Sequence, residues 1–132
     1  MSGHTKENVE PLLKVRNLRQ YYPVHGGVLG RVVNHVKAVD DISFDVYPGE
    51  TLSIVGESGC GKSTTGRSIL RLQEPTAGSI LFEGEDLTKL SSGQMRRRRK
   101  RMQIIFQDPY ASFNPRQTIH QLLDEAMAIQ RI

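Results

Sequence analysis

The sequence lacks the features that would place it in a membrane or cross-link it covalently. One cysteine, Cys60, occurs in 132 residues, so no intrachain disulfide can form, and this composition is typical of a reducing compartment. No apolar run approaches the length needed to cross a bilayer, and no apolar core follows the first residues, 1–7. We therefore expect a cytosolic polypeptide that does not itself span a membrane, with enough residues for one ordinary domain.

Positive charge is concentrated in one place. The formal net charge is +4, but the run from Arg96 to Arg101 carries six cations, and the remaining 12 basic residues face 14 acidic ones. The charge is therefore no general nucleic-acid footprint, and no nucleic-acid partner is expected. Such a run is usually a solvated helix face; the alternatives are contacts with anionic lipid head groups or with nucleic-acid phosphates.

Apolar patterning and turn residues predict an alternation of strands and helices. Residues 51–55 form a continuous apolar run, which is typical of a strand buried on both faces. Residues 23–34 are rich in Gly and Val and are expected to form an exposed loop. The expected strands are 12–18, 42–46, 51–55, 79–82 and 102–106, with turns at 48–49, 74–78 and 83–86. The expected helices are 62–72, a short surface helix capped by Ser91 or Ser92, and an amphipathic helix with a capping box at Thr118 and Gln121.

The stretch after the apolar run 51–55 has the pattern of a phosphate-binding loop. Backbone N–H groups must wrap a triphosphate, which requires glycines where side chains would block the approach. The following helix would direct its N-terminal N–H groups at the anion, and the Lys62 ammonium would reach the β- and γ-phosphates. The Ser63 hydroxyl falls where Mg²⁺ would sit. The residues expected to bind nucleotide here are Gly56, Glu57, Ser58, Gly59, Cys60, Gly61, Lys62, Ser63 and Thr64.

The spacing G-x-x-x-x-G-K-[ST] is a demanding pattern, and both flanks have the expected strand-then-helix character. A glycine-rich turn that merely joins a strand to a helix would not explain why Lys62 and Ser63 follow the last glycine. Cys60 is interpreted as a tolerated small side chain; the alternative is a redox sensor, because a helix N-terminus lowers the pKa of a thiol.

Four segments in fixed order carry a family resemblance. They are A-V-D-D-I-S-F from Ala38, G-E-T-L-S-I-V-G-E-S-G-C-G-K-S-T-T-G-R from Gly49, P-T-A-G-S-I from Pro75, and M-Q-I-I-F-Q-D-P-Y-A-S-F-N-P-R from Met102. The chain from about Leu12 onward resembles the N-terminal half of an ABC transporter ATP-binding subunit, most closely the dipeptide and oligopeptide importer branch. The resemblance implies a partial α/β P-loop NTPase fold. It would have an N-terminal antiparallel β-subdomain, parallel core strands and the start of the helical subdomain at the C-terminus.

Residue by residue, the resemblance extends the site. The loop Gly56–Thr64 matches the Walker A motif, and Gln107 matches the Q-loop glutamine, which lies near Mg²⁺ and the attacking water; Lys62 and Gln107 are the implied catalytic residues, and Ser63 and Gln107 the metal ligands. Tyr22 is the better match for the ring that stacks on adenine, with Tyr21 as the alternative. A core or edge aromatic remains the other interpretation of the tyrosine, and a polar strand cap that of Gln107.

Residues 90–94, Leu-Ser-Ser-Gly-Gln, look like the ABC signature but precede Gln107, whereas the family places its signature after the Q-loop. We therefore interpret them as a helix start. The expected organisation is a flexible N-terminus at 1–11 and a partial ABC-type nucleotide-binding domain at 12–132 that ends before the signature and Walker B motifs. On this basis we expect weak Mg-ATP binding with negligible hydrolysis by this chain alone.

The implied function is that of the ATP-binding component of a peptide importer. The resemblance implies a head-to-tail partner ATP-binding subunit, permease subunits contacted through the Q-loop, an extracytoplasmic peptide-binding protein acting indirectly, and a location on the inner face of the cytoplasmic membrane. The first alternative is a small P-loop kinase or GTPase, although the guanine-reading pattern N-K-x-D is absent from the sequence. The second is a non-catalytic remnant with a basic anion-binding surface.

Overall fold

The computed structural model describes residues 9–57, 59, 61–108 and 110–130. Its contacts divide the chain after Ser92 into two compact units, and each is described by itself. The first unit contains the sheet and helix α1, and the second contains most of α2 together with α3.

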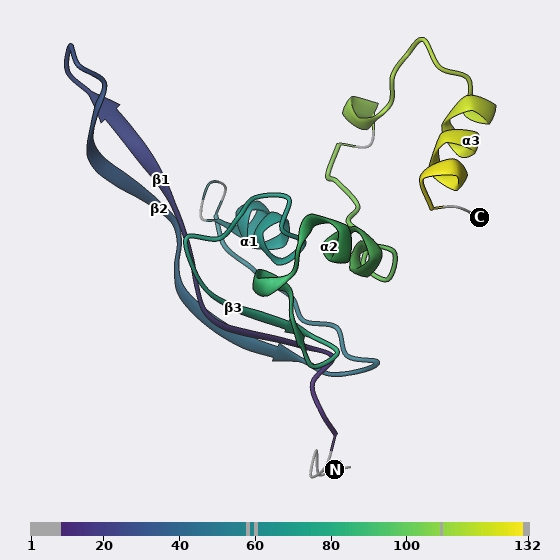
Figure 1. Ribbon diagram of the computed structural model, residues 1–132, viewed down its shortest axis with the longest axis horizontal. Helices are drawn as coiled ribbons and strands as arrows, with labels where there is room; N and C mark the ends of the chain where they lie inside the picture. The colour runs from purple at the N-terminus through teal and green to yellow at the C-terminus, as the bar shows by residue number, and fades with distance from the viewer. Residues whose placement is uncertain (1–8, 58, 60, 109, 131–132) are drawn as a thin grey trace. The chain divides into compact units, whose positions relative to one another are not determined.

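The sheet of the first unit has four strands in the order β2-β1-β3-β4 (Figure 1). Strand β1 spans Leu13–Gly26, β2 Arg31–Val46, β3 Ala77–Phe82 and β4 Glu85–Asp86. All pairs among these strands are antiparallel, and Val15 of β1 lies opposite both Phe44 and Ile80. The strands predicted at 12–18, 42–46 and 79–82 are therefore confirmed.

The β1–β2 hairpin is longer than the sequence predicted. The expected loop at 23–34 is wrong, because β1 continues to Gly26, β2 begins at Arg31, and Tyr22 pairs with Val36. Valines on both sides of the turn favour extended backbone, and the glycines that suggested a loop are confined to its tip. Gly27 and Gly30 have φ values of 80° and 60°, which are readily accessible only to glycine.

Helix α1, Lys62–Ile69, packs against the sheet through small and polar residues. Ser68 is fully buried and its hydroxyl donates to Oε1 of Gln20 on β1 at 3.3 Å. The remaining core is apolar, with side chains from all parts of the unit: Val15, Leu18, Val39, Leu70, Ile80, Phe82 and Leu87. This core fixes α1, and the loop that precedes it, relative to β1 and β2.

Arg71 joins the end of α1 to the segment after β4. Its Nη1 donates to the carbonyl oxygens of Leu87 and Leu90 at 2.7 and 2.8 Å, and its Nη2 lies 2.6 Å from Oε1 of Glu74. Leu87 belongs to the 3-10 helix η1, Leu87–Lys89. One arginine side chain thus provides hydrogen bonds to two backbone carbonyls and links the end of α1 to the segment after β4, which closes this side of the first unit.

The second unit is helical. Helix α2 spans Ser92–Arg99, the 3-10 helix η2 spans Tyr110–Ser112, and α3 spans Ile119–Gln130. The start of α2 at Ser92 confirms the interpretation of residues 90–94 as a helix start. The capping box is also confirmed: the Thr118 N–H donates to Oε1 of Gln121 at 2.8 Å, and the Gln121 N–H donates to Oγ1 of Thr118 at 3.3 Å. Within the described residues, no helix combines the length and the apolar character required to cross a bilayer.

Two expected strands, 51–55 and 102–106, are not strands in the structure. The expectation that 51–55 is buried on both faces is also wrong, since Val55 is 87% exposed and Ile54 is 45% exposed. A doubly buried strand needs hydrogen-bonding neighbours on its edges and a layer over each face. The described sheet pairs only β1 to β4 and provides neither segment with a partner.

Candidate functional site

The predicted phosphate loop, residues 56–64, follows the irregular segment 51–55 and ends in the first turn of α1. Its described residues are Gly56, Glu57, Gly59 and Gly61 to Thr64; Ser58 and Cys60, also predicted to bind nucleotide, lie outside the described residues. Helix α1 begins at Lys62, as the motif requires, and its first turn carries no acidic residue. The N-terminal N–H groups of the helix therefore meet an anion without competition from a carboxylate of that turn.

Gly61 is required by the geometry in two independent ways. It caps α1 with φ 94°, in the left-handed region. A Cβ atom placed on it would lie 2.1 Å from the carbonyl oxygen of Ala38 on β2, which is a backbone atom that cannot move aside. The loop backbone therefore packs directly against β2 at Gly61. Any residue with a side chain would prevent this contact.

The Lys62 side chain folds back across the loop. Its ammonium donates to the carbonyl oxygens of Gly56 and Glu57, the second at 2.6 Å. The ammonium therefore lies on two neutral carbonyl oxygens of the loop, which anionic phosphate oxygens can replace as stronger acceptors. Ser63, the next residue, is exposed and presents its hydroxyl at the same helix end.

Thr65 and Ser68 hold the helix start in place, although the sequence did not single them out. The Thr65 N–H and hydroxyl both donate to the Gly61 carbonyl at 2.8 Å, and Thr65 is 3% exposed. Ser68 bonds to Gln20, as described above. Helical spacing from Lys62 would place Thr65 and Ser68 on one face, but only the fold shows that this polar face is the buried one.

The two candidate tyrosines are both tied to neighbours in the first unit. The Tyr22 hydroxyl donates to Oε1 of Gln73 at 2.6 Å, beyond the C-terminal end of α1. The Tyr21 hydroxyl donates to Asp40, which raises the pKa of the tyrosine with a further contribution from burial, and the Lys37 ammonium lies 5.6 Å from its ring centroid. Adenine stacking on either ring stays a prediction.

Gln107 lies in the second unit, at an exposed bend after residues 102–106. The phosphate loop and Gln107 thus belong to different units, and the roles of Gln107 as a metal ligand and a catalytic residue stay predictions. Ile105 and Phe106, directly before it, are 94% and 43% exposed, so this segment presents apolar side chains beside its polar one.

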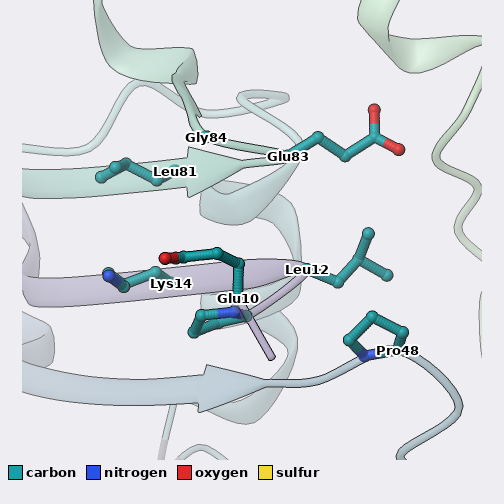
Figure 2. A pocket seen from close by; sticks show the side chains of 8 residues that line it. Glu10, Leu12, Lys14, Pro48, Leu81, Glu83 and Gly84 are labelled. Atoms are coloured by element: carbon teal, nitrogen blue, oxygen red, sulfur yellow. The ribbon is translucent and has the colours of Figure 1, made fainter. Parts of the chain in front are cut away.

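The first unit also has a hollow of about 420 Å³ at the other end of β1. Figure 2 shows its lining, which comes from the start of β1 and the residues before it, the turn after β2, and the end of β3 with the turn that follows: Glu10, Pro11, Leu12, Lys14, Pro48, Leu81, Glu83 and Gly84. None of the predicted nucleotide-binding residues lines this hollow. The phosphate loop, rather than this hollow, is the part of the first unit with phosphate-binding chemistry.

Comparison with known proteins agrees with this geometry. The ABC transporter family model matches residues 39–131. The chain is 50% identical over 122 residues to the oligopeptide transport ATP-binding protein AppF of Bacillus subtilis (strain 168), covering 92% of the chain and 37% of AppF. It is 52% identical over 120 residues to the glutathione import ATP-binding protein GsiA of Escherichia coli (strain K12), covering 91% of the chain and 19% of GsiA. The chain therefore spans well under half the length of these relatives.

Solved structures agree with the fold class. The dimeric structure of MJ0796, a bacterial ABC transporter cassette, superposes with a TM-score of 0.70 at 22% identity, over 89% of this chain and 47% of that one. A post-hydrolysis dimer of the same cassette, bound to ADP and Pi, gives a TM-score of 0.56 at 27% identity, over 66% and 35%. The expected partial P-loop NTPase fold with an antiparallel β-subdomain is confirmed by these likenesses, but the expected parallel core strands are not among the described strands, all of whose pairs are antiparallel.

Proposed function

The chain belongs to the ABC transporter family, and we propose that it is the ATP-binding, energising component of an importer for peptides. The observation that carries this proposal is the phosphate loop: Gly61 caps α1 against β2, and Lys62 lies across the loop on the Gly56 and Glu57 carbonyls. The importer class is supported by the likeness to proteins named for oligopeptide transport and glutathione import.

The residues present fit a magnesium–nucleotide complex. Lys62 would move its ammonium from the loop carbonyls to the β- and γ-phosphate oxygens, while the N-terminal N–H groups of α1 hold the same anion. Ser63 would place its hydroxyl on the Mg²⁺ ion, with Gln107 as a second ligand. Bound Mg²⁺ supplies neutralisation of charge on the phosphates; the chain's own part is to bind and orient them.

Nucleotide binding is tested by calorimetry of the full chain with Mg-ATP. Lys62→Ala removes a charge-assisted bond, so we expect an affinity loss of about tenfold to a hundredfold. Lys89→Ala is the matched control, because that lysine is 82% exposed, pairs with Asp86 and belongs to η1 rather than to the loop. Equal affinity of wild type and Lys62→Ala would overturn the proposal.

We propose further that the Tyr22 ring stacks on the adenine. Tyr22→Phe keeps the ring and loses only the hydroxyl bond to Gln73, so it should bind ATP almost as wild type does. Tyr22→Ala should lose roughly 1–3 kcal/mol of binding free energy. Loss of affinity in Tyr21→Ala with full affinity in Tyr22→Ala would assign the ring to Tyr21 instead. Competition between ATP and GTP distinguishes base stacking, which tolerates either base, from the strict preference of a GTPase.

The proposed assembly is a head-to-tail pair with a second ATP-binding subunit, joined to permease subunits near Gln107 on the inner face of the cytoplasmic membrane and served by an extracytoplasmic peptide-binding protein. It is supported by the dimeric state of the MJ0796 cassette and by the exposed apolar side chains of Ile105 and Phe106 next to Gln107. Cross-linking through a cysteine placed at Ile105, in the presence of the permease subunits, tests the second contact; no cross-link would contradict it.

A further inference from the structure

The end of the β1–β2 hairpin, residues 24–36, exposes an unusual amount of apolar surface for a strand pair. We call these residues the hairpin tip. In Figure 1 the hairpin continues away from α1 and β3, so the tip stands clear of the rest of the first unit. Val28 is 104% exposed and Leu29 78%, and the flanking valines Val24, Val32 and Val36 are 39%, 49% and 53% exposed. Exposed apolar side chains gathered at the end of one hairpin mark a candidate contact site.

The turn presents Val28 and Leu29 in a fixed geometry. They lie between Gly27 and Gly30, both at positive φ, and the Gly30 N–H donates to the Gly27 carbonyl at 3.4 Å. The His25 ring nitrogen Nδ1 lies 3.0 Å from the Gly30 carbonyl and braces the turn from the side. The side chains of Val28 and Leu29 are therefore the outermost ones of the hairpin. The glycine on either side of this pair adds no side chain that would cover them.

The charge around the tip has one sign. Residues 24–36 contain no Asp or Glu, and their one lysine or arginine is Arg31; Arg19 and Lys37, farther from the turn, pair with Asp41 and Asp40. Arg31 pairs with Gly26 in the strand ladder, so its charge lies at the first position above the turn. An anionic surface that approaches the tip would meet two apolar side chains first and a cation directly behind them.

We propose that the hairpin tip docks on an anionic lipid bilayer, with Val28 and Leu29 entering the interface and Arg31 at the level of the lipid phosphates. Apolar side chains in front of cations are the arrangement that interfacial binding requires. A bilayer fits better than an acidic protein because the outermost residues offer apolar side chains alone, without a polar side chain to read a partner's shape. The contact is independent of the phosphate loop and goes beyond nucleotide binding.

Tryptophan fluorescence tests the contact locally, because the natural chain contains no tryptophan. Val28→Trp places one indole at the tip of the full chain. Ile105→Trp is the matched control, since Ile105 is also apolar and 94% exposed but follows the basic run 96–101. With phosphatidylcholine vesicles that contain about a third phosphatidylglycerol, we expect a blue shift and quenching by brominated acyl chains in Val28→Trp only.

Three outcomes overturn the proposal. A shift in Ile105→Trp alone would assign lipid binding to the basic run, and equal shifts in both variants would mean non-specific adsorption. An indole at residue 28 that aqueous iodide quenches equally with and without vesicles would leave a protein as the occupant of the tip. Lys62→Ala introduced into Val28→Trp should leave the lipid response unchanged, which separates this proposal from nucleotide binding.

The electrostatic part is tested by vesicle co-sedimentation. Arg31→Gln should lower the affinity for the anionic vesicles roughly fivefold, because a cation near such a surface contributes about 1 kcal/mol. Arg116→Gln, which removes an exposed cation from the second unit, should change it less. Equal losses in the two variants would show that net charge, and not the tip, determines binding.

Discussion

The sheet of the first unit and helix α3 of the second both carry a clear apolar pattern, but only the sheet buries it. Val15, Leu18 and Ile80 on neighbouring strands are fully buried, whereas none of the described residues of α3 is buried and Leu123 is 57% exposed. An apolar sequence pattern shows which face of a strand or helix favours burial. That face stabilises the fold only when another part of the protein packs on it.

The phosphate loop and the Gln107 segment also differ in how far they are packed against the rest of their units. The phosphate loop is held by β2 at Ala38 and by the buried residues of α1, so its geometry is set within the first unit. Gln107 follows an exposed apolar segment in the second unit. The start of α1 at Gly61 is therefore fixed within the first unit, whereas Ile105 and Phe106, directly before Gln107, are left exposed.

The largest effect on stability is expected from truncating a buried side chain of the sheet. Leu18→Ala should cost about 2–5 kcal/mol of the free energy of unfolding, because it deletes a side chain with no exposure and leaves a cavity. Leu123→Ala makes the same chemical change on α3 and should stay within about 0.5 kcal/mol. Urea unfolding followed by circular dichroism measures both, and similar costs in the two variants would show that α3 is as well packed as the sheet.

The next effect contrasts two glycines near the phosphate loop. Gly61→Ala should cost about 1–3 kcal/mol from backbone strain alone, with the clash against the Ala38 carbonyl in addition. Gly66→Ala, inside α1 and with no atom within 4 Å of the added methyl group, should stabilise the helix by up to about 1 kcal/mol.

Unfolding in urea and Mg-ATP binding should respond together in these glycine variants. Gly61→Ala should lose both stability and nucleotide affinity, while Gly66→Ala should keep its affinity. A Gly61→Ala protein with wild-type stability and binding would show that the approach to β2 is not needed.

Local rules predicted those elements whose causes lie within a few residues. The strand alternation at 42–46, the start of α1 at Lys62 and the capping box at Thr118 are of this kind. The strands expected at 51–55 and 102–106 failed because a continuous apolar run forms a strand only when neighbours pair with it. The loop expected at 23–34 failed because the paired valines outweigh the glycines of the turn.

The candidate site, like the fold, was predictable where its features are local in the sequence. The motif located Gly61 and Lys62, since glycine spacing and the following lysine are local features. The contact of Gly61 with Ala38 and the bond between Ser68 and Gln20 join residues that are distant along the chain, so no local pattern could show them. Arg71, which closes the first unit, carries no sequence signal beyond its charge.

A smaller effect is expected at the N-terminus of α3. Thr118→Ala removes the hydroxyl that accepts from the Gln121 N–H and should cost about 1 kcal/mol of helix stability. Thr118→Ser keeps the acceptor and is the control. Because α3 contributes no buried residue, the loss should appear as faster amide exchange within 119–130 and leave the protection of β1 unchanged. Faster exchange in β1 would contradict the separation of the two units.

The smallest effect concerns an ion pair at the edge of the sheet. Arg16 donates to Asp45 through Nη1 at 2.6 Å and Nη2 at 3.0 Å, and this bond lowers the pKa of the Asp45 carboxyl. A carboxylate whose folded pKa is lowered stabilises the fold above its unfolded value, about 3.9, and loses that contribution as the pH falls through the folded pKa. Because the two side chains are 40% and 25% exposed, screening should keep the effect small.

Asp45→Asn should therefore flatten, but not abolish, the loss of stability below about pH 4, since the bonds from Thr88 also lower the pKa of Asp86 against the opposing effect of burial. Parallel urea-midpoint profiles of Asp45→Asn and wild type between about pH 2 and 6 would show that this pair contributes nothing measurable even in the well-packed unit.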